Sequence, residues 1–348
     1  MRNARAAHPT RRGILAAGGA IGLGAALAAC GDDDAKSDGS GDGAGTGKSG
    51  PWSFKDDRGT TVKLDSVPKN IVAFTGVAAA LWDYGVQVKG VFGPTTTKDG
   101  KPDVQAGDLD VSKVTVLGNE WGKLNVEKYA SLAPEVLVTT TFDTAGTLWS
   151  VPEESKDKVA KLAPSVAISV FDRQLTQPLQ RMWELAESLG ADMKAKKVTD
   201  AKAAFEKAAA RLRAAAKAKP EIRVLAGSAS ADLFYVSGTN LSVDLEYFKS
   251  LGVNFVEPSE EAKKATGGWF ESLSWENVDK YPADVIIMDD RASTIQPADI
   301  TEGTWKQLPA VKAGQVIARS PEPILSYAKC TPLLDNLAEA IENAKKVG

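Results

Sequence analysis

The side chains that most often carry nucleophilic or metal chemistry are scarce in this sequence. The 348 residues include one histidine, His8, and two cysteines, Cys30 and Cys330. Most nucleophilic enzymes and most transition-metal sites depend on these two residue types. The position of each of the three residues therefore bears on function.

Two of the three lie in or next to an export signal. Four arginines precede an uncharged run over 13–29, the layout of a secretory signal. Within it, 10–15 (TRRGIL) looks like a twin-arginine export motif, and 27–30 (LAAC) looks like a bacterial lipobox. We expect cleavage before Cys30 and a lipid-modified Cys30 that anchors the chain to the outer face of the bacterial cytoplasmic membrane. The alternative is a membrane-spanning helix, which this short, glycine-rich run disfavours.

Cleavage at this point changes what the mature chain can do. It removes His8 and four arginines, so the net charge of −3 becomes −7. Without histidine, neither a Ser-His-Asp nor a Cys-His mechanism is available, nor is metal ligation through imidazole. Cys330 is left without a partner for an intramolecular disulfide. The full sequence has 42 basic and 45 acidic residues, and this nearly balanced composition gives no sign of a nucleic-acid partner.

The mature chain divides into a tether and two lobes. Residues 30–51 are rich in Gly, Asp and Ser and predict a flexible acidic tether. Short β-branched runs then alternate with helical patterns, which favours an α/β fold with central, mostly parallel sheets. We expect one Rossmann-like lobe over 52–190 and a second over 220–348. The β-branched runs are 71–74, 114–117, 136–139, 166–170, 222–225, 233–236 and 285–288.

A long helix is predicted between the two lobes, over 191–219. Apolar residues recur there at three- and four-residue steps, and Pro220 ends the pattern. So long a helix with a narrow apolar stripe suits a spine that joins the lobes. An ordinary surface helix of one lobe is the alternative. The stripe consists of Val198, Ala201, Phe205, Ala208, Leu212 and Ala215.

A weak internal repeat supports two related lobes. Segments 125–138 (NVEKYASLAPEVLV) and 274–287 (SWENVDKYPADVII) lie on either side of the predicted spine. Each has a polar helix cap, a glutamate two residues later, a short helix, a proline and a buried strand. The pairing, more than either segment alone, is the signal.

From residue 52 onward the chain resembles the substrate-binding lipoproteins of ATP-driven importers for iron siderophores and cobalamin. The resemblance rests on the order and spacing of the two repeat segments together with 54–62 (FKDDRGTTV), 67–73 (VPKNIVA) and 305–316 (WKQLPAVKAGQV). It implies two α/β lobes joined by one long helix, with the ligand in the cleft between them. It also implies a monomer that has no catalytic activity and no cofactor, and that delivers its cargo to an ABC permease dimer with its ATPase.

In the family, one glutamate on each lobe docks onto arginines of the permease, and Glu127 and Glu276 occupy the matching places. Each also falls in the first turn of a predicted helix, where a carboxylate complements the helix dipole without any partner. Docking is the interpretation that we favour.

Aromatic residues in predicted loops are the candidate ligand contacts, because open α/β sheets bind ligands at the carboxyl ends of their strands. Trp269 takes the position of an aromatic wall in similar hydroxamate binders, and Trp121 and Phe142 fall where the first lobe would contact the ligand. Arg291 is the best cation for oxygen atoms around a chelated iron. Core packing is the alternative for each aromatic. The aromatic candidates are Trp121, Phe142, Trp149, Trp269, Phe270 and Tyr327.

The expected ligand is a ferric siderophore, most simply a neutral or mildly charged hydroxamate, since a net charge of −7 does not attract a strongly anionic catecholate. Its iron is already chelated, so no metal ligand from the protein is required. Cobalamin, haem and ferric citrate are alternative cargoes. An enzyme is less consistent with the sequence: Ser228 lacks a nucleophile elbow, and Asp289 and Asp290 should point to opposite faces of a strand. A structural or adhesive lipoprotein would need no cleft.

Overall fold

The computed structural model describes residues 50–348. The predicted signal, the lipidation site at Cys30 and nearly all of the tether lie outside the described residues. In the part that is described, no helix has both the length and the apolarity needed to cross a bilayer.

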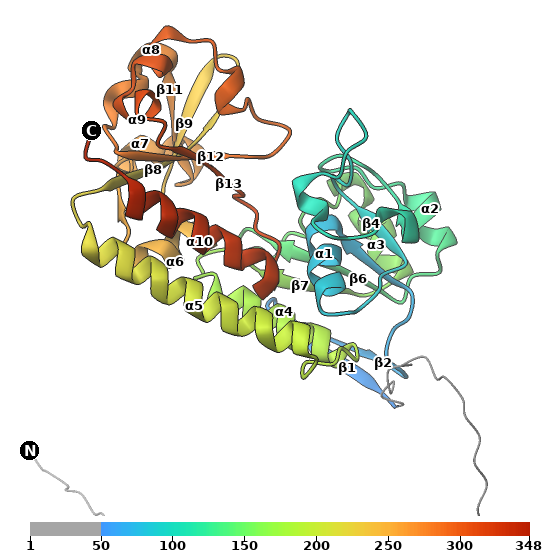
Figure 1. The fold of residues 1–348 in the computed structure, drawn as a ribbon. Helices are drawn as coiled ribbons and strands as arrows, with labels where there is room; N and C mark the ends of the chain where they lie inside the picture. The colour runs from blue at the N-terminus through green and yellow to red at the C-terminus, as the bar shows by residue number, and fades with distance from the viewer. Residues whose placement is uncertain (1–49) are drawn as a thin grey trace, which may run out of the picture. The chain divides into compact units, whose positions relative to one another are not determined.

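The first lobe is built on a fully parallel sheet of five strands in the order β5-β4-β3-β6-β7. Its central strands are buried along their whole length, because helices cover both faces (Figure 1). An antiparallel hairpin of β1 (Trp52–Lys55) and β2 (Thr61–Leu64) opens the lobe. The sheet strands are β3 (Ile71–Phe74), β4 (Gly90–Phe92), β5 (Thr115–Val116), β6 (Val136–Thr141) and β7 (Ser165–Ser169); the helices are α1 (Thr75–Asp83), α2 (Val126–Ser131), α3 (Lys156–Leu162) and α4 (Thr176–Ser188).

The second lobe has a mixed sheet of six strands in the order β11-β9-β8-β12-β13, with β10 added to the start of β8. Strands β8, β10, β12 and β13 are parallel, whereas β9 runs antiparallel to both of its neighbours, β8 and the edge strand β11. The strands are β8 (Arg223–Ala229), β9 (Leu233–Ser237), β10 (Asn254–Phe255), β11 (Phe270–Ser274), β12 (Val285–Asp289) and β13 (Val316–Arg319); the helices are α6 (Val243–Ser250), α7 (Glu260–Lys263), α8 (Gly303–Gln307) and α9 (Pro309–Lys312), with the 3₁₀ helix η5 (Trp275–Lys280).

The predicted spine is α5 (Lys196–Ala218), which begins five residues later than expected and is about 34 Å long. Its start packs near Asp83 and Tyr84 of the first lobe, and its end leads into β8. Five of the six residues of the predicted stripe are buried, and the sixth, Ala201, is half-buried. The spine helix is therefore confirmed.

A second connection between the lobes was not predicted. After β13, residues 320–326 return to the first lobe, where the Ser326 hydroxyl donates to Asp83 Oδ2 at 2.5 Å. Helix α10 (Tyr327–Asn343) then runs back along α5 (Figure 1). Arg211 of α5 forms an ion pair with Glu342 near the C-terminal end of α10, with 2.7 Å between Nη2 and Oε2. Residues 320–326 and α10, in addition to α5, thus span the lobes.

Candidate ligand-binding site

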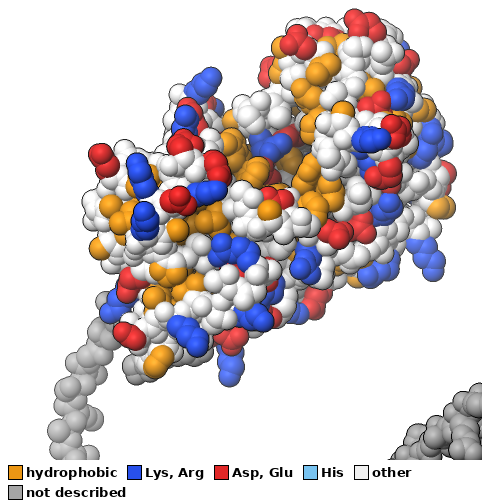
Figure 2. Space-filling view, turned by 180° about the vertical axis from the view of Figure 1, so that it is seen from behind, with side chains coloured by type: hydrophobic (Ala, Val, Ile, Leu, Met, Phe, Trp, Pro, Cys, Tyr) orange, Lys and Arg blue, Asp and Glu red, His pale blue; other side chains and the backbone are white. Residues whose placement is uncertain are grey.

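A cavity of about 470 Å³ lies between the lobes, at the carboxyl ends of β6, β8, β12 and β13. A smaller space of about 40 Å³ adjoins it, and the two share Phe142, Ser242, Trp269, Pro321 and Glu322. The space-filling view shows this hollow between the two lobes, with hydrophobic side chains on its walls and charged side chains at its floor (Figure 2). Its volume is typical of a small-molecule site.

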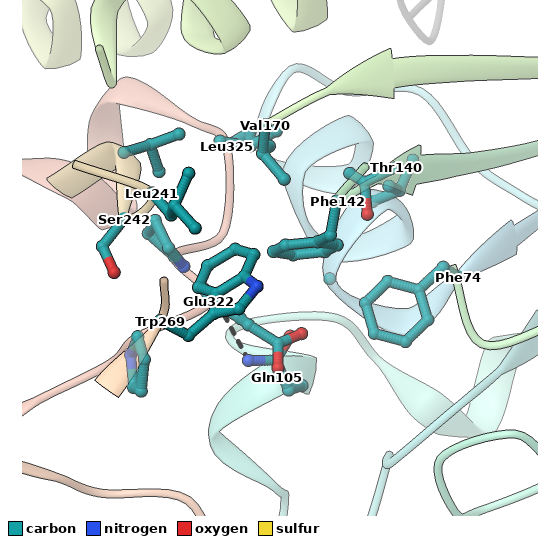
Figure 3. A pocket seen from close by; sticks show the side chains of 15 residues that line it. Phe74, Gln105, Thr140, Phe142, Val170, Leu241, Ser242, Trp269, Glu322 and Leu325 are labelled. Atoms are coloured by element: carbon teal, nitrogen blue, oxygen red, sulfur yellow. Dashed lines mark hydrogen bonds between the residues drawn. The ribbon is translucent and has the colours of Figure 1, made fainter. Parts of the chain in front are cut away.

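Aromatic side chains from both lobes form the walls. Phe142 and Trp149 come from the loop after β6, with ring centroids 4.5 Å apart, and Trp269 faces them from the second lobe at 6.4 Å from Phe142. Figure 3 shows the Phe142 and Trp269 side chains lining the smaller space. Phe270 lines the larger cavity. Four of the predicted aromatic candidates are therefore brought together.

The main chain fixes two of these rings. The amide of Trp149 donates to Thr140 O at 2.9 Å, and its carbonyl accepts from the Thr139 hydroxyl at 2.9 Å, so β6 holds the loop on both sides. Trp269 follows Gly267 and Gly268, whose φ angles of 66° and 96° favour glycine. The Gly-Gly pair therefore makes the turn that presents Trp269.

The other two aromatic candidates lie elsewhere. Trp121 stands behind the wall, with its ring 5.9 Å from Trp149 and 5.4 Å from Phe74, and does not line either space. Tyr327, at the start of α10, packs edge-on against Trp183 and Phe205. Tyr327, predicted as a ligand contact, does not line either space, because the unpredicted second connection carries it to the spine.

The floor of the cavity is an ion-paired cluster. Arg291 donates from Nη2 to Asp289 Oδ2 at 2.6 Å and from Nη1 to Glu322 Oε1 at 2.6 Å, while its Nε also faces Asp289. Arg291 was expected to be available for the ligand, yet each of its three nitrogens donates to a carboxylate. Of the two carboxylates, Asp289 is only two residues away in the sequence. Glu322 is brought to Arg291 by the second connection, which was not predicted.

Glu322 was missed by the sequence reasoning, although both lobes hold it. Trp149 Nε1 donates to Glu322 Oε2 at 3.1 Å, and Gln105 Nε2 donates to the Glu322 carbonyl at 3.0 Å (Figure 3). The side chain is 10% exposed. Burial raises the pKa of Glu322 to about 7, although Arg291 and the Trp149 N–H favour the ionised form. The available signal was a charged residue between two prolines, 321–323, after a β-branched run.

The second arginine of the lining, Arg319, is also paired. Its guanidinium makes two bonds to Asp244, Nε–Oδ2 at 2.7 Å and Nη2–Oδ1 at 2.8 Å, and both side chains are at most 5% exposed. Asp143 adds another carboxylate to the lining. Among the described residues, both arginines of this cavity are thus neutralised by carboxylates, and the balance of charge is acidic.

The two candidate docking glutamates are exposed on separate lobes. Glu127 lies in the first turn of α2, whose cap Asn125 accepts from the Lys128 amide at 2.9 Å. Glu276 lies in the first turn of η5, where hydrogen bonds from its own amide and from Ser274 lower the pKa of its carboxyl. Both helix starts are confirmed, whereas docking remains a prediction.

The groups considered for catalysis do not cooperate. Asp289 pairs with Arg291 in the cavity, while Asp290 accepts from the Ser320 hydroxyl at 2.8 Å. The two carboxylates therefore serve different partners, as alternation along a strand predicts. Within residues 50–348 there is no group of three or more His, Cys, Asp or Glu side chains placed to hold a metal ion.

Comparison with known proteins identifies the class. The model of the periplasmic binding protein family matches residues 72–323, so the chain belongs to that family of extracytoplasmic binding proteins. At the level of individual proteins, the chain is 96% identical to DesE, a ferric-siderophore receptor protein from Streptomyces coelicolor. The match to the DesE crystal structure covers 85% of this chain and 100% of DesE, with a TM-score of 0.85.

More distant structures share the fold alone. The siderophore periplasmic binding protein from the fuscachelin gene cluster of Thermobifida fusca is 22% identical, with a TM-score of 0.56 over 79% of this chain and 96% of its own. The petrobactin-binding protein YclQ of Bacillus subtilis is 18% identical, with a TM-score of 0.62 over 84% and 99%. No curated protein sequence matches the chain.

Proposed function

We propose that this protein binds a ferric siderophore of the hydroxamate type outside the cytoplasm and delivers it to an ABC importer for iron uptake. The observation that carries the proposal is the inter-lobe cavity, which combines apolar aromatic walls with a charge-compensated floor. The 96% identity to a protein described as a ferric-siderophore receptor supports the same ligand class.

The geometry suits capture without chemistry. A chelated ferric ion needs no ligand from the protein, so the site has to supply flat apolar surface and a few hydrogen-bond donors. Trp149 and Trp269 supply the surface, and Arg291 and Trp149 carry donors at the floor. Three hydroxamates neutralise one ferric ion, whereas three catecholates leave a trianion. An acidic lining therefore favours the hydroxamate.

The remaining parts of the delivery system are proposed on the sequence. Cys30 carries the lipid anchor, and 30–51 is the tether that lets a monomeric receptor reach the permease dimer and its ATPase. Glu127 and Glu276 contact permease arginines, one from each lobe. Exposure of both carboxylates in the structure supports this role.

A binding titration tests the ligand class. The form from Trp52 onward, which contains every described helix and strand, is titrated with a ferric trihydroxamate, a ferric tricatecholate, ferric citrate, haem and cobalamin, following tryptophan fluorescence. We expect saturable quenching with the trihydroxamate, because Trp149 and Trp269 line the cavity. Trp149→Phe and Trp269→Phe should remove most of the signal, whereas Trp305→Phe, a buried tryptophan outside the cavity, should not. Absence of a response to every iron chelate would reject the proposal.

A further inference from the structure

Glu322 occupies two of the hydrogen-bond donors that line the cavity. Its Oε2 accepts from Trp149 Nε1 and its Oε1 accepts from Arg291 Nη1, at 3.1 and 2.6 Å. Trp149 comes from the first lobe and Arg291 from the second, so one carboxylate engages both sides of the cavity. Oxygen atoms of a ligand have to compete with Glu322 for these donors.

The position of Glu322 also exposes any ligand to its charge. The residue lines both the larger and the smaller space, and the low solvent exposure of its side chain limits screening by water. Four other charged side chains of the described residues line the larger cavity: Asp143 after β6, Asp289 and Arg291 at and after the end of β12, and Arg319 at the end of β13. Asp244 of α6 neutralises Arg319, so Asp289 and Glu322 share Arg291.

We infer that Glu322 is a specificity-determining residue that sets the charge class of the ligand. By engaging Trp149 and Arg291 and placing a carboxylate at the floor, it admits neutral and cationic chelates and disfavours anionic ones. This inference rests on the proposed function, because it concerns which ferric chelate is selected.

Protonation of Glu322 should tune this selection. Because the pKa of Glu322 is raised to about 7, the carboxyl is largely neutral at pH 6 and ionised at pH 8. Discrimination against anionic chelates should therefore strengthen as the pH rises across this range. Every variant compared below keeps the other charged groups that face the cavity. These are Asp289, Arg291, Arg319 with its partner Asp244, and Asp143.

The experiment uses three ferric trihydroxamates that differ in one terminal group: an ammonium, an acetamide or a succinamate. Their overall charges are about +1, 0 and −1 between pH 6 and 8, given ordinary amine and carboxyl pKa values. Dissociation constants are measured by tryptophan quenching for the wild-type form from Trp52 onward, Glu322→Gln and Glu322→Asp. Glu154→Gln, which removes an exposed carboxylate of the first lobe outside the cavity, is the matched control.

At pH 8 we expect the wild type to bind the cationic chelate about tenfold more tightly than the anionic one. This ratio should fall to about twofold in Glu322→Gln and should approach that value in the wild type at pH 6. Glu322→Asp, which keeps the charge, and Glu154→Gln should keep most of the wild-type ratio.

The outcomes separate the two proposals. Binding of the chelates with a ratio that is the same in wild type and a folded Glu322→Gln would overturn the role of Glu322 and leave the siderophore function standing. An equal fall of the ratio in Glu154→Gln would also overturn it, because net surface charge would then explain the selection. If the wild type bound none of the three chelates, the proposed function itself would fail.

Discussion

Glu322 pays a free-energy cost for its position, and its neighbours offset only part of it. The carboxylate is removed from water, and its charge is balanced by Arg291, which Asp289 shares. Desolvation exceeds these favourable contacts, so the proton is held more tightly than in the unfolded chain. A group of this kind links folding to pH.

The sign of the linkage follows from the raised pKa. Between pH 4.5 and about 7 the folded chain retains the Glu322 proton and the unfolded chain loses it, so the free energy of unfolding falls as the pH rises. We predict that Glu322→Gln gains stability relative to wild type across this window, by roughly 1 to 3 kcal/mol. Urea denaturation at several pH values measures the difference.

Exposed carboxylates supply the control for this prediction. Glu154→Gln should show no comparable trend over the same pH range, because Glu154 is exposed. A stability difference between wild type and Glu322→Gln that does not change with pH would contradict the assignment of a raised pKa to Glu322.

At the scale of elements, the sequence was informative where a pattern was long or a segment fully buried. The stripe of α5 and the runs that became β3 and β12 located these elements to within a few residues. Strands β10, β11 and β13 were not predicted, because two to five residues with mixed exposure carry little periodicity. Strand β4 was also missed: it is fully buried but only three residues long. The antiparallel direction of β9 relative to β8 and β11 depends on long-range pairing that local sequence does not encode.

One buried ion pair joins elements of the second lobe. Arg319 of β13 and Asp244 of α6 make two bonds and are nearly inaccessible to solvent. We predict that Arg319→Met lowers the free energy of unfolding by about 3 to 5 kcal/mol, because Asp244 would remain buried without its partner. Chemical denaturation of the two proteins gives the value directly.

Arg211→Met is the matched comparison. Arg211 joins α5 to Glu342 of α10, but its side chain is 39% exposed and that of Glu342 is 40% exposed. Its loss should cost about 1 kcal/mol or less. Equal losses for the two variants would show that burial does not set the value of these pairs.

At the scale of the whole molecule, the two lobes share the order of elements in the repeated segments but differ in the type of helix that these segments form. The repeated segments became an α-helix in α2 and a 3₁₀ helix in η5, each presenting an exposed glutamate in its first turn. Four of the aromatic residues that line the cavity were predicted because loops after strands converge in such folds. Glu322 and the position of Tyr327 were not predicted, since both depend on the path of the second connection, which the sequence around residues 320–326 does not specify.

The surface glutamates lead to a prediction about the assembled importer. Glu127→Arg combined with Glu276→Arg should reduce iron-chelate uptake by cells at least about tenfold, through like-charge repulsion at the permease. The dissociation constant for the chelate should stay within about twofold, because neither residue lines the cavity. Uptake assays and fluorescence titrations test the two halves.

Acids away from these two helix starts provide the control. Glu154→Arg combined with Glu302→Arg, at an exposed glutamate of the first lobe and a half-buried glutamate of the second, should leave uptake near the wild-type value. Loss of chelate binding in the Glu127 and Glu276 variant would instead assign these residues to the integrity of the lobes.

The second connection restricts the freedom of one lobe to rotate against the other. A lobe joined through a single helix can rotate about the axis of that helix, whereas a lobe joined through two helices packed side by side cannot rotate in this way. Since α5 and α10 both run between the lobes and pack along each other, torsion about the long axis would have to shear that packing. Bending in which the two helices flex together is the mode that remains, so a ligand meets walls whose relative twist is already set.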